Sequence, residues 1–377
     1  MKLKKIISTA LVFAMLLTAV TMNFTAFGAS YSGDCGDGVE WSLDTADGVL
    51  VVSGDGAMTD YSDEDTLPWE SYKSSIKKVT VESGVASVGD RAFAGCEALA
   101  SVTLADSVKT VGGFAFSDCV ALEEIAFGNG VTTIENNAFE GCKVLKSVTL
   151  PEALASIGEY AFAECYKLGS VAIPDGVKEI GDYAFSYCGS LKSVDFGKAI
   201  ETIGTGAFTN TALESVEIPS SVKSIGNYAF SEIFTLTEVT FNFGLISLGD
   251  GAFQFTSITE AAIPASVTAI GEKAVGYDMS GGKANGFVIT CYKGTQAYAY
   301  AEANGFECEL LTADLGDANF DGEINSQDAL VVLQAATGRI KLSAEQKTFA
   351  DVNKNEVVNS ADALRILQFA TDKIKEF

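Results

Sequence analysis

The chain has 377 residues, of which 47% are hydrophobic and only five are proline. This composition favours packed structure over disorder, and the length allows two or three domains. The formal net charge is −25, so we expect no nucleic acid partner, because an acidic protein and a phosphate backbone repel each other. The chain contains no histidine, which excludes Ser-His-Asp and Cys-His catalysis and every metal site built on histidine.

Residues 1–29 have the pattern of a secretory signal peptide. Lys2, Lys4 and Lys5 precede an apolar run over residues 6–20, and small residues follow at 26–29. The apolar run is shorter than the roughly 20 residues that a membrane-spanning helix needs. The sequence therefore predicts a secreted, extracellular protein with no transmembrane segment.

A repeat of 22 or 23 residues occupies the middle of the chain. Each unit has an apolar-x-apolar strand such as Val171-x-Ile173, a glycine such as Gly181 that permits a tight bend, and an Ala-Phe pair in a short helical or irregular turn. One unit cannot bury its own apolar side, whereas stacked units can. The pattern predicts a solenoid in which equivalent residues form ladders. The phenylalanines of the core ladder are Phe93, Phe116, Phe139, Phe162, Phe185, Phe208, Phe230 and Phe253.

Five cysteines follow successive phenylalanines of this ladder by three residues. Later units have Thr211, Ile233 and Thr256 at this place, as expected of a small buried slot and not of a metal or redox site. Because stacked side chains point in parallel, we expect free, buried thiols. These cysteines are Cys96, Cys119, Cys142, Cys165 and Cys188. A bond between Cys291 and Cys308 is left open.

The repeat units, with their Ile-Gly, Ala-Phe and Cys-x-x-Leu patterns, resemble the BspA-type leucine-rich repeats of bacterial surface proteins. The resemblance implies a leucine-rich-repeat solenoid with short strands and short helical or irregular turns, an α/β-type repeat, over residues 76–310 including a closing C-terminal cap. It also implies a β-rich N-terminal cap over residues 30–75. By analogy the solenoid contacts a protein or a cell surface, and its ligand is not specified.

A run of oxygen-bearing residues after Leu315 has the spacing of an EF-hand-like calcium loop, with Gly322 at its sharp turn. The spacing returns 34 residues later, with Glu356 in place of the glycine and one carboxylate fewer. We therefore expect two Ca²⁺ sites, the second weaker. The predicted ligands are Asp317, Asn319, Asp321, the carbonyl of Glu323, Asn325 and Asp328 in the first loop, and Asp351, Asn353, Asn355, the carbonyl of Val357, Asn359 and Asp362 in the second.

Each loop runs into an amphipathic helix, and residues 314–377 together resemble a type I dockerin. The resemblance implies a small all-α calcium-binding domain whose partner is the cohesin module of a scaffoldin. The partner-binding residues that it implies are Ser326, Gln327, Gln334, Ser360, Ala361 and Gln368.

These features predict a secreted, non-catalytic binding protein that a dockerin attaches to a cellulosome-type scaffold. One alternative is a cell-surface or host adhesin. Another is a polysaccharide-degrading enzyme that uses two carboxylates, although the acidic residues of the repeats stand at varying places and the repeat leaves no room for a catalytic domain.

Overall fold

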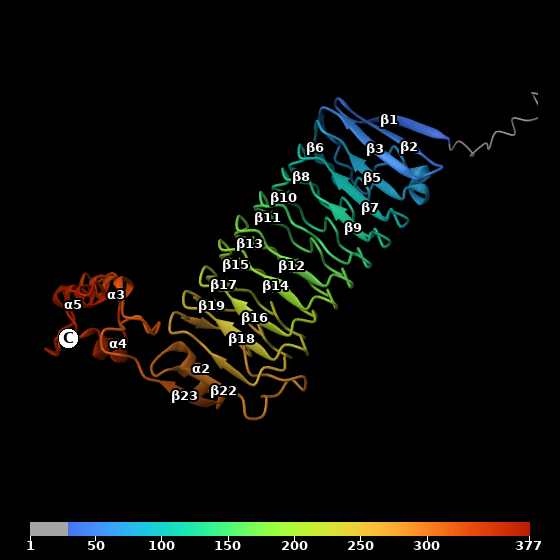
Figure 1. Cartoon of the computed structure of the whole chain (residues 1–377). Helices are drawn as coiled ribbons and strands as arrows, with labels where there is room; N and C mark the ends of the chain where they lie inside the picture. Colours follow the sequence, from blue (N-terminus) through green and yellow to red (C-terminus); the bar gives the residue numbers. More distant parts are fainter. Residues whose placement is uncertain (1–28) are drawn as a thin grey trace, which may run out of the picture.

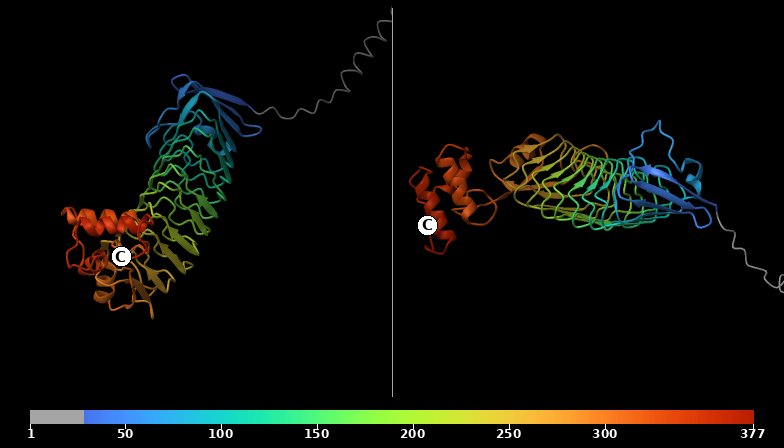
Figure 2. Two further views of the ribbon diagram at one scale, coloured as in Figure 1. Left: turned by 60° about the vertical axis from the view of Figure 1, so that its left-hand side comes forward. Right: turned by 90° about the horizontal axis from the view of Figure 1, so that it is seen from above.

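The computed structural model describes residues 29–377 (Figure 1). The predicted signal peptide lies almost entirely outside the described residues. The described chain forms a long solenoid, and a small helical domain follows its last turn (Figures 1 and 2). This architecture confirms the predicted solenoid with a small helical C-terminal region. No helix within residues 29–377 is both long enough and apolar enough to cross a membrane.

A three-stranded antiparallel sheet opens the solenoid and continues directly into it. The third strand of this sheet pairs in parallel with the first strand of the repeats. Trp41 and Trp69 are buried beneath it, in an edge contact with ring centroids 5.6 Å apart. The sheet therefore covers the apolar end of the first turn. Its elements are β1 (Ser30–Gly36), β2 (Val39–Asp44) and β3 (Val49–Gly54), with the 3-10 helix η1 (Glu70–Ser75) after them.

Each repeat contributes strands to two parallel stacks, which form two sides of the solenoid. Residues one repeat apart are partners, as in the pair Thr133 and Ser156. The short strands form one 10-stranded sheet: β4 (Gly56–Ala57), β6 (Val85–Val88), β8 (Thr110–Val111), β10 (Thr133–Ile134), β11 (Ser156–Ile157), β13 (Glu179–Ile180), β15 (Thr202–Ile203), β17 (Ser224–Ile225), β19 (Ser247–Leu248) and β21 (Ala269–Ile270). The other stack contains β5 (Lys78–Val81), β7 (Ser101–Leu104), β9 (Glu124–Ala126), β12 (Ser170–Ala172), β14 (Ser193–Asp195), β16 (Ser215–Ile218), β18 (Glu238–Phe241), β20 (Glu260–Ala262), β22 (Val288–Tyr292) and β23 (Glu307–Leu311).

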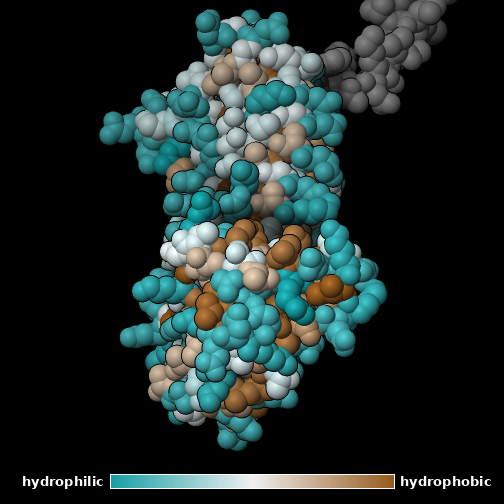
Figure 3. Space-filling view, turned by 90° about the vertical axis from the view of Figure 1, so that its left-hand side faces the viewer, coloured by the Kyte–Doolittle hydropathy of each residue, from teal (hydrophilic) through white to brown (hydrophobic). Residues whose placement is uncertain are grey.

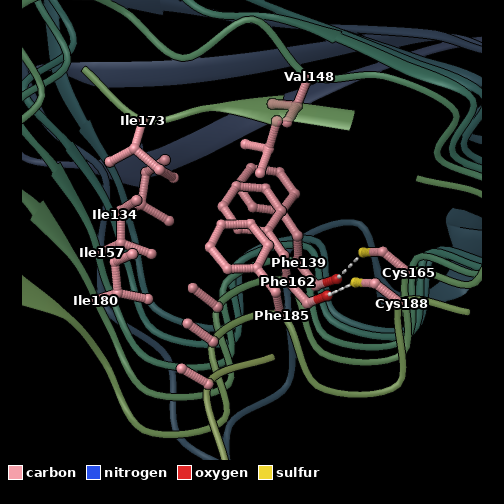
Figure 4. Packing of buried hydrophobic residues seen from close by; sticks show 14 of the residues in the cluster. Ile134, Phe139, Val148, Ile157, Phe162, Cys165, Ile173, Ile180, Phe185 and Cys188 are labelled. Atoms are coloured by element: carbon pink, nitrogen blue, oxygen red, sulfur yellow. Dashed lines mark hydrogen bonds between the residues drawn. The ribbon is translucent and has the colours of Figure 1, made fainter. Parts of the chain in front are cut away.

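A continuous aromatic ladder fills the space between the two stacks (Figure 4). All eight phenylalanines of the Ala-Phe pairs are 0% exposed, and neighbouring rings stack with centroids 5.0 to 5.4 Å apart. Trp69 begins the ladder by stacking on Phe93 at 5.1 Å. Full burial of each ring contributes roughly 1.5 to 3 kcal/mol, so contacts between neighbouring turns hold the solenoid together.

The third side of each turn, which carries the Ala-Phe pair, is irregular in place of helical. Two residues per turn adopt left-handed backbone conformations, for example Tyr160 at φ 54° and Glu164 at φ 58°. Backbone amides on this side donate to the next turn, as Phe162 does to the carbonyl of Ala184 at 2.8 Å. These ladder bonds hold a conformation that residues other than glycine rarely adopt.

The cysteine ladder lies beside the phenylalanine ladder, and its thiols are buried and unpaired. Each of four Sγ atoms points at the carbonyl of a phenylalanine in the turn before, as Cys165 does to Phe139 at 3.4 Å and Cys188 to Phe162 at 3.2 Å (Figure 4). Burial raises the pKa of the Cys96 and Cys188 thiols to about 12. The thiols therefore have a structural role and stay protonated.

Helix α2 (Gln296–Asn304) closes the solenoid, capped by the hydroxyl of Thr295 at its start and by Gly305 at φ 64° at its end. The helical domain then contains α3 (Ser326–Ala336), α4 (Ala344–Ala350) and α5 (Ser360–Ala370). Phe320 joins the two parts, since its ring is 3% exposed and stacks on Tyr292 of β22 at 4.6 Å.

Candidate calcium loops and docking helices

The first loop brings three carboxylates together at the start of α3. Oxygens of Asp317, Asp321 and Asp328 all lie within 4.8 Å of one another, and Asp317 and Asp328 are 1% and 0% exposed. Desolvation by burial, followed by the charge of neighbouring carboxylates, raises the pKa of Asp328 to about 6. Burial likewise raises the pKa of Asp317. Three convergent buried carboxylates have the chemistry of a divalent cation site.

Backbone amides fix the orientation of these side chains. The amides of Asp321 and Gly322 donate to the two oxygens of Asp317, at 3.1 and 3.2 Å. Asp328 accepts from Asn319 at 3.1 Å and from Asn325 at 2.8 Å. The other predicted ligands of this loop lie around the cluster: Asn319 is 6% exposed, while Glu323 and Asn325 are joined by a side-chain hydrogen bond of 3.3 Å.

The second loop repeats this arrangement with fewer carboxylates. Asp351 accepts from the amides of Asn355 and Glu356, at 3.1 and 2.7 Å, and the buried Asp362 accepts from Asn359 at 3.0 Å. Glu356 has φ 68°, so this loop holds a non-glycine residue in the left-handed turn that Gly322 makes in the first.

One buried atom of the second loop supports a cation there. The side-chain oxygen of Asn353 is buried and has no hydrogen-bond partner, although its amide nitrogen donates to Asp362 at 2.7 Å. An unpaired buried acceptor is costly unless a cation or water satisfies it. Both loops therefore have residues that fit Ca²⁺, and the carbonyl of Val357 now accepts from Asn359 at 3.0 Å.

Each loop ends in a capping box that starts a helix. The side chain of Asn325 accepts from the Gln327 amide while Asp328 accepts from the Asn325 amide, and Asn359 and Asp362 do the same at α5. The residue that closes each candidate site thus also begins the following helix. Occupancy of the loop and position of the helix are linked through this shared side chain.

Helices α3 and α5 pack on each other through a small core that includes Val332 and Ile366, both 0% exposed. Of the predicted partner-binding residues, Ser326, Gln327, Ser360 and Ala361 are exposed at the two helix starts, and Gln334 and Gln368 are partly buried. The pairs occupy equivalent positions 34 residues apart, so the domain presents two similar surfaces.

Four exposed leucines on these helices were missed by the sequence reasoning. Leu330 and Leu333 on α3 are 53% and 43% exposed, and Leu364 and Leu367 on α5 are 56% and 41% exposed. On the side of the molecule where the helical domain lies, apolar residues interrupt a mostly hydrophilic surface (Figure 3). The sequence held a signal, because five consecutive apolar residues from Ala329 to Leu333 exceed what one buried helix face accommodates.

The fold and the paired acidic loops define a repeat solenoid joined to a cation-loop docking domain. The chain belongs to the BspA type leucine rich repeat family, whose model matches residues 71–188 and 155–279, more than half of the chain together. The dockerin type I domain model matches residues 315–369. Dockerin domains typically bind Ca²⁺, and a dockerin implies docking to a cohesin.

Solved structures of bacterial leucine-rich repeat proteins are similar to the chain. A protein from Bacteroides ovatus ATCC 8483 is 27% identical with a TM-score of 0.54, over 73% of this chain and 66% of that one. A cell surface protein from Faecalibacterium prausnitzii A2-165 is 18% identical with a TM-score of 0.37, over 78% of this chain and 98% of that one. No curated protein sequence matches the chain.

Proposed function

We propose that the chain is a secreted, non-catalytic binding protein that docks through Ca²⁺-dependent cohesin binding onto a cellulosome-type scaffold and uses its solenoid as an interaction module. The observation that carries the proposal is the pairing of two loop-helix units, each with a capping box that shares a carboxylate with a candidate Ca²⁺ site. Metal binding in such a unit fixes the helix that a partner contacts. A scaffold partner also agrees with an extracellular location.

The residues that would hold Ca²⁺ are the carboxylates, amides and carbonyls of the two loops. The ion would supply positive charge to Asp317, Asp321 and Asp328, whose mutual repulsion otherwise opposes the compact loop. The exposed leucines of α3 and α5 then form the apolar centre of a docking surface, with Ser326 and Ser360 at its edge. Interfaces of this kind have apolar centres and polar rims.

The experiment is titration of the chain with cohesin modules from the same organism, in calcium and in excess chelator. We expect binding in calcium and its loss in chelator. Binding that is unaffected by chelator, or no binding to any cohesin of that organism, would contradict the docking proposal. Hydrolysis of a polysaccharide by the purified chain in an activity screen would contradict the non-catalytic part.

A further inference from the structure

The irregular side of the solenoid carries exposed aromatic side chains on neighbouring turns. Tyr166, Tyr187, Tyr228 and Phe234 are 40%, 49%, 46% and 49% exposed. Scattered single apolar residues on a surface are ordinary, whereas a cluster of aromatic rings along one side indicates a binding surface. We call this cluster, together with Tyr160 and Tyr183, the aromatic strip.

The rings of the strip follow the axis of the solenoid. Tyr160 and Tyr183 occupy equivalent positions in adjacent turns, and their rings stack with centroids 4.9 Å apart and planes 14° apart. The ring of Tyr183 lies over Gly206 of the next turn, where an added Cβ would be 2.3 Å from its Cε1 atom. Tyr228 lies over Gly251 in the same way. The absence of Cβ at these glycines lets each ring lie along the turn that follows.

Carboxylates surround these rings. Glu164 accepts from the hydroxyl of Tyr166 at 2.7 Å. Desolvation, then the proximity of Tyr183 and the charges of Glu140, Glu159 and Asp182, raise the pKa of Tyr160. The strip is therefore aromatic and rich in anionic hydrogen-bond acceptors, which suits a ligand with many hydroxyl donors and disfavours a polyanion.

The repeat of the solenoid indicates a polymer as the ligand. Successive turns offer a ring or an acceptor about every 5 Å, since strands in neighbouring turns are ~4.8 Å apart. One sugar unit of an extended pyranose polymer advances by a similar length, and its C–H faces pack on aromatic rings while its hydroxyls donate to carboxylates. A folded protein presents no such repeat along its surface.

We propose that the aromatic strip binds an uncharged polysaccharide that lies along the solenoid axis. The inference rests on the proposed function in that it names the ligand class of the interaction module, and it does not require that the dockerin binds a cohesin. Tyr160, Tyr183 and Tyr187 supply the platform over two adjacent turns, with Tyr166 at its edge and Tyr228 two turns further along.

Native affinity electrophoresis of the full mature chain tests this proposal, because the acidic chain migrates readily. The gels contain β-glucan, xyloglucan, xylan or glucomannan as neutral polymers and polygalacturonate as a polyanion. We expect at least one neutral polymer to retard the chain. The combined substitution Tyr160→Asn, Tyr183→Asn and Tyr187→Asn should weaken that binding at least tenfold. No retardation by any neutral polymer, or retardation by polygalacturonate alone, would overturn the proposal.

The native chain supports the choice of asparagine. Asn137 occupies the same place in its turn as Tyr160 and Tyr183, and Asn210 the same place as Tyr187, each with positive φ. The substituted turns should therefore fold, which thermal unfolding and retained cohesin binding would check. Should the triple variant unfold, Tyr183→Phe and Tyr187→Phe provide the second measurement, since they keep the rings and should bind within threefold of the native chain.

Tyr31→Ala is the matched control, because this exposed tyrosine lies in the N-terminal sheet, away from the strip. The control should bind polysaccharide as the native chain does. Equal loss in the control, unchanged binding in the triple variant, or loss of a protein ligand in place of a sugar would overturn the proposal. Loss of cohesin binding with polysaccharide binding retained would contradict only the docking function.

Discussion

Glu356 illustrates how one residue can weaken a metal loop. It adopts φ 68° where the first loop has Gly322 at φ 85°, and a side chain in the left-handed region costs on the order of 1 kcal/mol. Glu356→Gly should therefore stabilise the second loop by about 1 kcal/mol and tighten its Ca²⁺ binding. Calorimetric Ca²⁺ titration measures the effect, and Gly322→Ala should do the reverse at the first site. No gain from Glu356→Gly would mean that the turn carries no strain.

The eight cysteines divide into different environments. The ladder thiols point at phenylalanine carbonyls, whereas the Sγ atoms of Cys291 and Cys308 lie 3.1 Å apart on neighbouring parallel strands. We expect alkylation of the native protein to leave the five ladder thiols unlabelled until the solenoid unfolds, because they are buried and protonated. Peptide mapping of exported protein should find a disulfide between Cys291 and Cys308 if it finds one at all. Rapid labelling of Cys96 to Cys188 would contradict the buried ladder.

Among the elements, the phenylalanine ladder carries the cohesion of the solenoid. Phe185 is 0% exposed and stacks on Phe162 and Phe208 at 5.4 Å each. Phe185→Ala should reduce the free energy of unfolding by about 3 to 5 kcal/mol, read from urea unfolding followed by circular dichroism. Phe185→Leu is the control and should cost less, since the apolar Val275 takes the equivalent place one repeat after Phe253. Equal stability of the alanine variant would show that the ladder is not cohesive.

The loop-helix units should depend on calcium for their folding. Empty loops hold Asp317, Asp321 and Asp328 within 4.8 Å of one another, and a cation offsets that repulsion while the shared Asp328 starts α3. Chelation should therefore abolish helical signal in a fragment of residues 314–377. Asp317→Ala should impair Ca²⁺ binding more than Asp351→Ala, because the first loop has more carboxylates. A fragment equally helical with and without chelator would disprove the dependence.

Sequence periodicity predicted the elements whose pattern is local, and not those that tertiary hydrogen bonds impose. The strands and the inward phenylalanines follow from alternation and repeat length. The left-handed residues on the irregular side could not be predicted, because Tyr183 and Glu232 have no preference for that conformation and adopt it under hydrogen bonds from neighbouring turns. For the same reason the loop spacing indicated the ligands, whereas the unpaired oxygen of Asn353 needed coordinates.

At the scale of the whole molecule, the candidate metal loop lies against the solenoid. Phe320, between the ligands Asn319 and Asp321, packs on Tyr292 at 4.6 Å and on Phe349 at 5.6 Å. Spacing alone could not predict this contact, because it joins the last turn of one domain to a loop of the next. The junction gives the docking domain a defined place at the end of the solenoid.

The two similar surfaces of the docking domain lead to a prediction about assembly. Ser326, Leu330 and Gln334 on α3 correspond to Ser360, Leu364 and Gln368 on α5, and the helices pack against each other. A cohesin could therefore bind in either of two orientations, which differ modestly because Gln327 and Ala361 break the match.

Substitution of Ser326 and Gln334 by bulky charged residues should leave substantial cohesin binding through the α5 surface, and the converse pair, Ser360 and Gln368, should leave binding through α3. Only the combined variant should lose several kcal/mol of binding free energy, as expected when an interface loses both of its hot-spot sets. Isothermal titration of the three variants with a cohesin from the same organism measures this. Complete loss in either half-variant would show that a single surface docks, because a redundant second surface would then have no binding capacity of its own.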